Sequence, residues 1–139
     1  MQDSRSIETP LKHPGTGRSA AVIQVADFWS AHPIRIQSGK YVLLVASEKE
    51  ATQAKVEVAR AWVEAGASYI CAWGPNSPED EETFDYASFL PELGEPLPFT
   101  LMTTNHKSER LEEALWFAFY NATPPENLHE ELNSVVVVV

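Results

Sequence analysis

The chain has 139 residues and a mass of 15.5 kDa, with 44% hydrophobic and 22% charged residues, which is typical of one globular domain and excludes a fibrous repeat or a wholly disordered chain. Its longest apolar runs, 41–46 and 135–139, are far shorter than the roughly 20 residues of a membrane-spanning helix, so we expect no membrane association. A single cysteine cannot form an internal disulfide, and the first residues lack the apolar segment of a secretory signal, so we expect a cytoplasmic protein.

Charge is distributed unevenly along the chain. Residues 1–70 carry eight Lys and Arg against seven Asp and Glu, whereas residues 71–139 carry two against thirteen. Such an acidic half repels phosphate backbones, and no basic patch is interleaved with aromatic residues, so we expect no nucleic-acid ligand. The acidity is compatible with a basic protein partner, and it is equally compatible with a role in solubility alone.

The first elements are an arm and a helix. Residues 1–19 are polar and contain two prolines and two glycines, which predicts a flexible N-terminal arm ahead of a single domain over 20–139. Apolar residues between 20 and 31, among them Phe28 and Trp29, predict a short amphipathic helix that ends before Pro33.

Strands and helices then alternate. The continuous apolar run 41–46 predicts a strand buried on both faces. Ser47 is a candidate N-cap for a helix that ends at Gly66. A second strand over 68–73, a helix from Ser77 to before Pro91, a third strand over 99–104 and a helix that begins at Ser108 and ends before 124 follow. The five closing valines predict a fourth strand, either inside the sheet or, alternatively, at its edge, where it could pair with another protein.

This order predicts an α/β three-layer sandwich. We expect a four-stranded, mainly parallel sheet with a Rossmann-like or flavodoxin-like order, which for four strands in chain order is 2-1-3-4.

Three segments carry a resemblance to a known family: 69–75 (YICAWGP), 102–106 (MTTNH) and 112–117 (EEALWF). Their order and spacing over about 40–124 resemble a family of small bacterial proteins that is classified as a domain of unknown function. The resemblance implies a bacterial source and a shared α/β core, and it implies no catalytic role.

The carboxyl ends of the predicted strands offer one candidate site, because ligands of open parallel sheets bind there. The candidate ligand-binding residues are Ser47, Trp73, Asn76, Thr103, Asn105 and His106. If the protein is an enzyme, His106 is the candidate general base and Thr104 and Ser47 are its candidate hydroxyl partners. The alternative is that these residues only cap the last helix and the strand ends.

The sequence offers little support for a cofactor, a metal site or a catalytic cysteine. No phosphate-binding glycine loop and no metal-ligand spacing is present, so we expect no cofactor and no metal. Cys71 lies in the middle of a predicted strand, where a thiol is normally buried and inert.

The last helix offers a second candidate site. Beyond its core stripe it carries Trp116, Phe117 and Tyr120, with Glu109 and Glu113 beside them. Either the N-terminal helix covers these aromatic residues, or they form an exposed surface with an acidic rim, which is typical of protein-binding sites.

Two hypotheses for the function follow. The first is a non-enzymatic, acidic protein-binding or regulatory module, such as an immunity protein or an antitoxin, that uses the last helix. The second is a small-ligand-binding protein or hydrolase-like enzyme with its site at the carboxyl ends of the strands.

Overall fold

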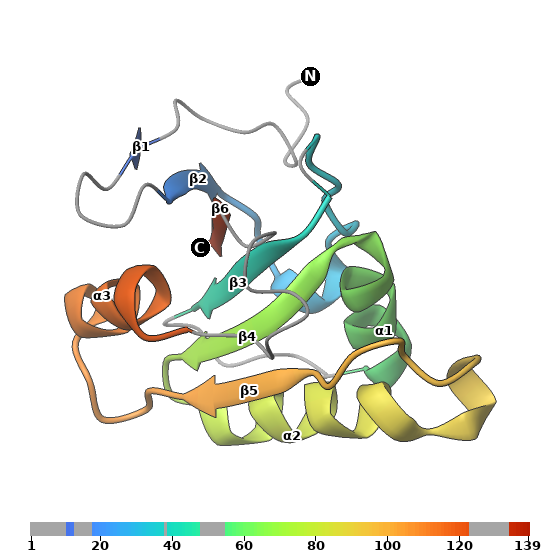
Figure 1. Ribbon diagram of the computed structural model, residues 1–139. Coiled ribbons are helices and arrows are strands. Elements are labelled where there is room, and N and C mark those ends of the chain that lie inside the picture. The colour runs from blue at the N-terminus through green and yellow to red at the C-terminus, as the bar shows by residue number, and fades with distance from the viewer. Residues whose placement is uncertain (1–10, 13–17, 38, 48–54, 123–133) are drawn as a thin grey trace.

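The structure is a computed structural model that describes residues 11–12, 18–37, 39–47, 55–122 and 134–139. Its strands are β1 (Leu11–Lys12), β2 (Ser19–Ile23), β3 (Tyr41–Ala46), β4 (Ala67–Trp73), β5 (Met102–Asn105) and β6 (Ser134–Val138). Its helices are α1 (Val56–Ala65), α2 (Ser77–Phe89) and α3 (Leu111–Tyr120), with short 3-10 helices η1 (Phe28–Ser30) and η2 (Pro91–Leu93). Figure 1 shows helices on both faces of a twisted sheet, which confirms the α/β three-layer sandwich.

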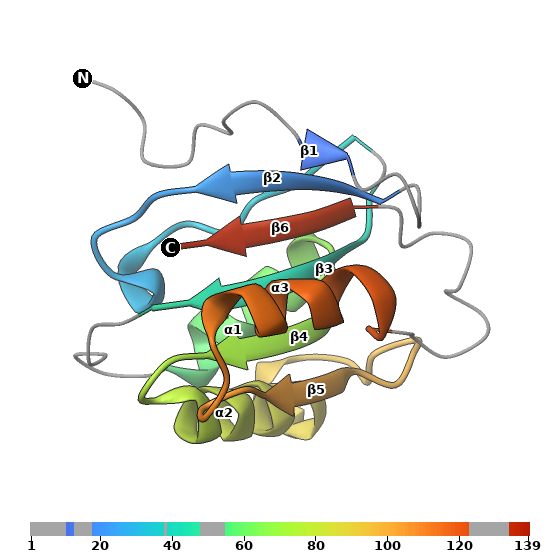
Figure 2. The ribbon, with the colours of Figure 1, turned by 90° about the vertical axis from the view of Figure 1, so that its left-hand side faces the viewer.

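The sheet has six strands in the order β1-β2-β6-β3-β4-β5. The five strands from β2 to β5 in this order are parallel, and β1 pairs antiparallel with β2. The expected number of four strands and the expected order 2-1-3-4 are therefore wrong. The valine strand β6 lies between β2 and β3, because the chain crosses back over the sheet through α3 after β5 (Figure 2). Of the two alternatives for the valine strand, the position inside the sheet is therefore confirmed and the position at its edge is wrong.

The N-terminal helix expected over 20–31 is also wrong. Residues Ser19–Ile23 form strand β2, which pairs with β6 along its whole length, and only Phe28–Ser30 are helical. The Asp27 side chain accepts a hydrogen bond from the Trp29 backbone N–H and so caps this single turn. Pairing with a strand more than 100 positions away along the chain overrides the local helical pattern.

The expected arm contributes to the fold at three places. Leu11–Lys12 pairs with β2 as an edge strand, and the Arg18 guanidinium donates to the carbonyl oxygens of Ala118 and Ala122 at the end of α3. Ser19 is the first residue of β2, and the other residues of the arm lie outside the described residues. The first half of the helix expected from Ser47 to Gly66 lies there too, and its described part is α1.

Each face of the sheet has its own core. All six residues of β3 are buried, so their side chains alternate between the two cores. Leu43 and Ile70 pack under α1, α2 and η1 together with Trp62 and Phe84. Val42, Leu44 and Tyr69 pack under α3 on the other face. Phe28 and Trp29 belong to the first core, so they do not cover α3.

Tight backbone contacts bring the carboxyl ends of β3 and β4 together. Gly74 follows β4 with φ of +116°, and a Cβ atom built on it would lie 1.9 Å from the Ser47 carbonyl oxygen. The Ser47 N–H in turn donates to the Trp73 carbonyl. Only glycine fits at position 74, because an added Cβ would collide with backbone.

Candidate functional site

A hollow of about 430 Å³ lies at the carboxyl end of the parallel sheet. Its lining comes from the ends of four parallel strands and the start of α3: Gln24, Val25, Ala26, Ala46, Ser47, Trp73, Leu111 and Val139. None of the lining side chains is charged. Of the expected ligand-binding residues, the structure places Ser47 and Trp73 here. We name this feature the carboxyl-edge hollow.

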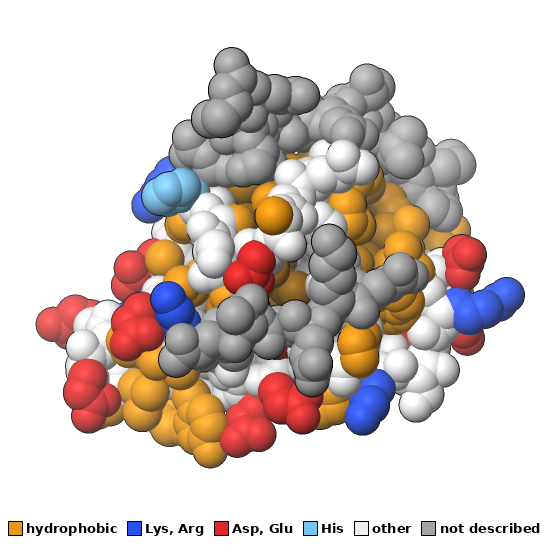
Figure 3. Space-filling model, turned by 180° about the vertical axis from the view of Figure 1, so that it is seen from behind, with side chains coloured by type: hydrophobic (Ala, Val, Ile, Leu, Met, Phe, Trp, Pro, Cys, Tyr) orange, Lys and Arg blue, Asp and Glu red, His pale blue; other side chains and the backbone are white. Residues whose placement is uncertain are grey.

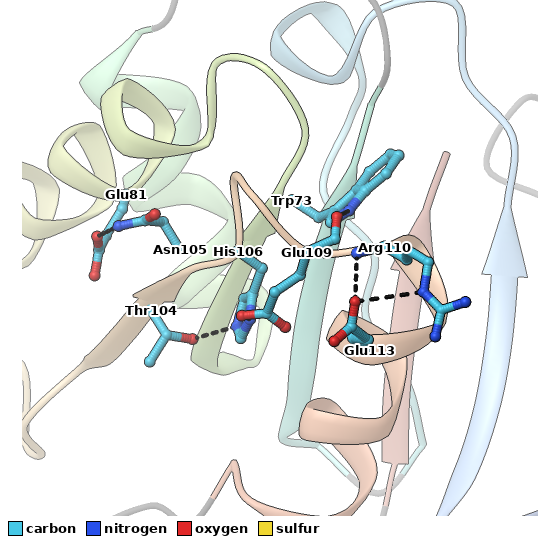
Figure 4. A network of polar contacts seen from close by, with 8 residues as sticks. All are labelled: Trp73, Glu81, Thr104, Asn105, His106, Glu109, Arg110 and Glu113. Carbon is cyan, nitrogen blue, oxygen red and sulfur yellow. Dashed lines mark hydrogen bonds and ion pairs between the residues drawn. The ribbon is translucent and has the colours of Figure 1, made fainter.

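His106 lies beyond the end of β5 in a polar network rather than in this hollow. Its side chain is only 4% exposed. Ring atom Nε2 lies 2.9 Å from the Thr104 hydroxyl, and Nδ1 lies 2.8 Å from Glu109 Oε2 (Figure 4). The Phe117 ring packs against the imidazole, with 4.8 Å between the ring centroids. The sequence placed Thr104 and His106 together correctly, and it missed Glu109 as the third member.

The order hydroxyl, imidazole, carboxylate is the order of the triads that activate a nucleophile. In the neutral imidazole, Nδ1 donates to Glu109, since a carboxylate only accepts, and Nε2 accepts from Thr104. Hydrogen bonding to the Thr104 hydroxyl also opposes the rise that burial causes in the pKa of the Tyr69 side chain.

Cys71 is fully buried below the same hydroxyl. Burial raises the pKa of its thiol to about 12, although the Thr104 hydrogen bond and the Arg18 charge oppose the rise. The thiol therefore stays protonated at neutral pH and is a poor nucleophile.

The network also fixes the start of α3. The Trp73 indole N–H donates to the Glu109 carbonyl oxygen at 2.8 Å, and the Arg110 backbone N–H donates to the Glu113 side chain at 2.9 Å. Hydrogen bonding to the Arg110 backbone lowers the pKa of the Glu113 carboxyl. The helix begins at Leu111, with Arg110 rather than the expected Ser108 at the N-cap position.

The remaining expected ligand-binding residues lie elsewhere. Side chains of successive strand residues point to opposite faces, so Thr103 and Asn105 face α2 whereas Thr104 faces α3. Asn105 donates to Glu81 Oε1 at 2.8 Å, and the Thr103 hydroxyl lies 3.0 Å from Glu81 Oε2. Asn76 occupies the N-cap position of α2 and makes no side-chain capping bond there. The expected single cluster is therefore divided among four places.

The outer side of α3 carries an exposed aromatic pair. The rings of Trp116 and Tyr120 stack with 4.8 Å between their centroids and 30° between their planes. Trp116 is 54% exposed and Tyr120 is 39% exposed. A hollow of about 490 Å³ beside them is lined by Glu109, Arg110, Glu112, Glu113, Trp116 and Phe117. We name these residues and Tyr120 the α3 face.

Within the described ranges, no three His, Cys, Asp or Glu side chains are grouped so that they could hold a metal ion. No helix of the described chain has the length and apolar character needed to cross a membrane.

Comparison with known families gives one match. Residues 21–139 match the family described as "Domain of unknown function (DUF7684)". The chain belongs to this family. The resemblance to a domain of unknown function that the sequence motifs indicated is thereby confirmed. No curated protein and no solved structure matches the chain.

In this DUF7684 domain, sequence reasoning missed three carboxylate partners that had a local signal. Glu109 follows His106 by three residues, the spacing at which side chains meet on one turn. Glu81 and Asp85 are spaced by four residues on the predicted helix 77–90, so both lie on one side of α2.

Proposed function

We propose that this DUF7684 domain is a non-enzymatic protein-binding or regulatory module whose binding site is the α3 face. The observation that carries the proposal is the stacked and exposed pair of Trp116 and Tyr120. Tryptophan and tyrosine are the residue types most enriched at the energetic centres of protein interfaces, because each buries a large area with little conformational entropy to lose.

The rim of the α3 face indicates the charge of the partner. Glu109, Glu112 and Glu113 line the hollow beside the aromatic pair, and the one basic side chain of this lining, Arg110, lies 3.5 Å from Glu113. The rim therefore carries more negative than positive charge, which favours a basic partner surface and speeds its encounter.

We place this binding in the bacterial cytoplasm. The resemblance to the family implies a bacterial source. The chain has one cysteine, which cannot form an internal disulfide, and this fits a reducing compartment.

Site-specific photo-crosslinking tests the proposed site. A photoreactive phenylalanine analogue replaces Tyr120 in one variant and Tyr86 in a matched control. Tyr86 lies on α2 and is 45% exposed, so the two positions differ in surface rather than in residue type or accessibility. The proposal predicts a defined protein adduct from position 120 in a native lysate, and that this same adduct does not form from position 86. Adducts of equal yield from both positions would contradict it.

The carboxyl-edge hollow supports a second candidate function, the binding of a small ligand. Its volume of about 430 Å³ lies within the range of small-molecule sites, and its position at the strand ends is where parallel sheets bind ligands. The uncharged lining favours a neutral, largely apolar molecule. A thermal-shift screen of such molecules tests this candidate, with Ala46→Trp as a variant that fills the hollow and abolishes any shift.

A further inference from the structure

The outer edge of β5 is open in the described structure. β5 pairs with β4 on one side, and no described strand pairs with it on the other (Figure 2). The His106 backbone N–H donates to the Ala72 carbonyl at 2.7 Å. Because backbone groups of alternate residues point to the same side of a strand, those of Thr104 also point toward β4. The backbone groups of Thr103 and Asn105 consequently point outward. Such an edge can accept another strand.

Side chains of α2 line this edge. Asn105 donates to Glu81, and the Thr103 hydroxyl lies within hydrogen-bonding distance of both Glu81 Oε2, at 3.0 Å, and Asp85 Oδ1, at 2.6 Å. One hydroxyl proton cannot serve two carboxylates at once. At least one carboxylate oxygen beside the edge can therefore accept from another donor.

Phe89 continues the same row one turn further along α2. Its side chain is 63% exposed, and it lines a hollow of about 370 Å³ together with Thr100 and Leu101, which precede β5. Figure 3 shows acidic and apolar side chains side by side along the lower part of the molecule, where α2 lies. The edge is therefore flanked by two carboxylates and then by an aromatic ring.

We propose that the open edge of β5 docks an extended, basic segment of a partner protein as an additional strand. Side chains two residues apart on a strand repeat every roughly 6.6 Å, and one helical turn from Glu81 to Asp85 rises by about 6 Å. Lysine or arginine at alternate positions of the added strand would thus meet Glu81 and Asp85 in turn, while its backbone pairs with Thr103 and Asn105.

A second copy of this chain is a poorer occupant. Edge-to-edge pairing of two β5 strands would bring Glu81 and Asp85 of both copies to one seam, and the full chain carries a net charge of −10. Like charges opposed across a sheet destabilise it. The inference shares with the proposed function only the class of ligand, a protein, since it concerns a different surface.

Fluorescence anisotropy tests the inference with the whole protein and a short, labelled peptide that alternates lysine and valine. The expected result is saturable binding that weakens about tenfold in the double variant Glu81→Gln/Asp85→Asn. The matched double variant Glu79→Gln/Glu82→Gln removes the same charge from exposed positions of the same helix and should bind like the wild type.

Two further arms separate strand addition from simple charge attraction. The same peptide with N-methyl groups on its backbone keeps every charge but cannot pair with β5, so it should not bind. Tyr120→Ala alters only the α3 face and should leave binding of the peptide unchanged. The test of the β5 edge is therefore independent of whether the α3 face binds a partner. Equal binding of the methylated peptide, equal loss in both double variants, or no binding by the wild type would overturn the inference.

Discussion

The imidazole of His106 and the carboxylate of Glu109 are joined by a 2.8 Å hydrogen bond that ties the end of β5 to the start of α3. His106 is buried, whereas Glu109 is partly exposed and also belongs to the α3 face. The turn that presents the proposed binding helix is therefore held by an internal network, which keeps the face in one position before a partner arrives.

Replacement of His106 should destabilise the fold. His106→Ala removes a buried ring, its contact with Phe117, and the hydrogen bonds that the ring makes with Thr104 and Glu109. We therefore expect the free energy of unfolding to fall by about 2–4 kcal/mol. Urea denaturation followed by tryptophan fluorescence measures it. A loss below about 0.5 kcal/mol would show that the network has no structural role.

The Arg18 guanidinium should also contribute to stability, although it lies in the expected N-terminal arm. It donates to the Ala118 oxygen at 2.8 Å and to the Ala122 oxygen at 3.0 Å, where the last carbonyls of α3 lack helical partners. Burial lowers the pKa of Arg18, and the group still retains its charge near neutrality. Arg18→Gln should cost about 1–2 kcal/mol in urea denaturation, and an unchanged midpoint would contradict this capping role.

A comparison of strands β3 and β2 shows how far the local sequence determines the fold. The apolar run 41–46 is buried on both faces and reads directly as strand β3. Ser19–Ile23 has the local pattern of a helix and becomes a strand only because the valines of β6 lie beside it. The strand order depends on the direction of the crossover through α3, which no local pattern encodes.

The candidate site was predicted to a similar extent. The sequence found Thr104, His106 and the aromatic pair on α3, because strand ends and helix faces follow from periodicity. It could not predict that Thr103 and Thr104 face opposite sides of the sheet, because the side that each residue faces depends on where β5 begins. The sequence pattern favoured Phe99 as the first strand residue, and the strand begins at Met102.

Asp80 should make stability depend on pH. Burial raises the pKa of its carboxyl to about 6, against the effect of the hydrogen bond that the Trp29 indole donates to Asp80 Oδ1. The folded state therefore binds the proton more tightly than the unfolded state, whose pKa is near 3.8. This contribution is fully present below about pH 4 and is lost as the pH rises to about 6.

The matched variant is Asp80→Asn, which keeps an acceptor for Trp29 and cannot ionise. At pH 7.5 it should be more stable than the wild type by on the order of 2 kcal/mol, and the difference should disappear near pH 4. Urea denaturation at both pH values measures it. A variant that is less stable than the wild type at pH 7.5 would show that the buried charge is compensated.

Cys71 should resist alkylation in the folded protein. Its thiol is fully buried and its pKa is raised to about 12 by burial, so almost no thiolate is present or accessible near neutral pH. Iodoacetamide should label it only after denaturation, as intact-mass spectrometry would show. Rapid labelling under native conditions, with circular dichroism unchanged, would contradict the buried position.

The most direct measurement of the proposed function is affinity capture from native bacterial lysate with three proteins: the wild type, Trp116→Ala and Tyr86→Ala. Both replaced side chains are aromatic and exposed, and they lie on α3 and α2 respectively. The account predicts a stoichiometric, basic protein bound by the wild type and by Tyr86→Ala and lost from Trp116→Ala, with all three equally folded by circular dichroism. Retention of the same protein by Trp116→Ala, or no captured protein at all, would contradict a binding site on the α3 face.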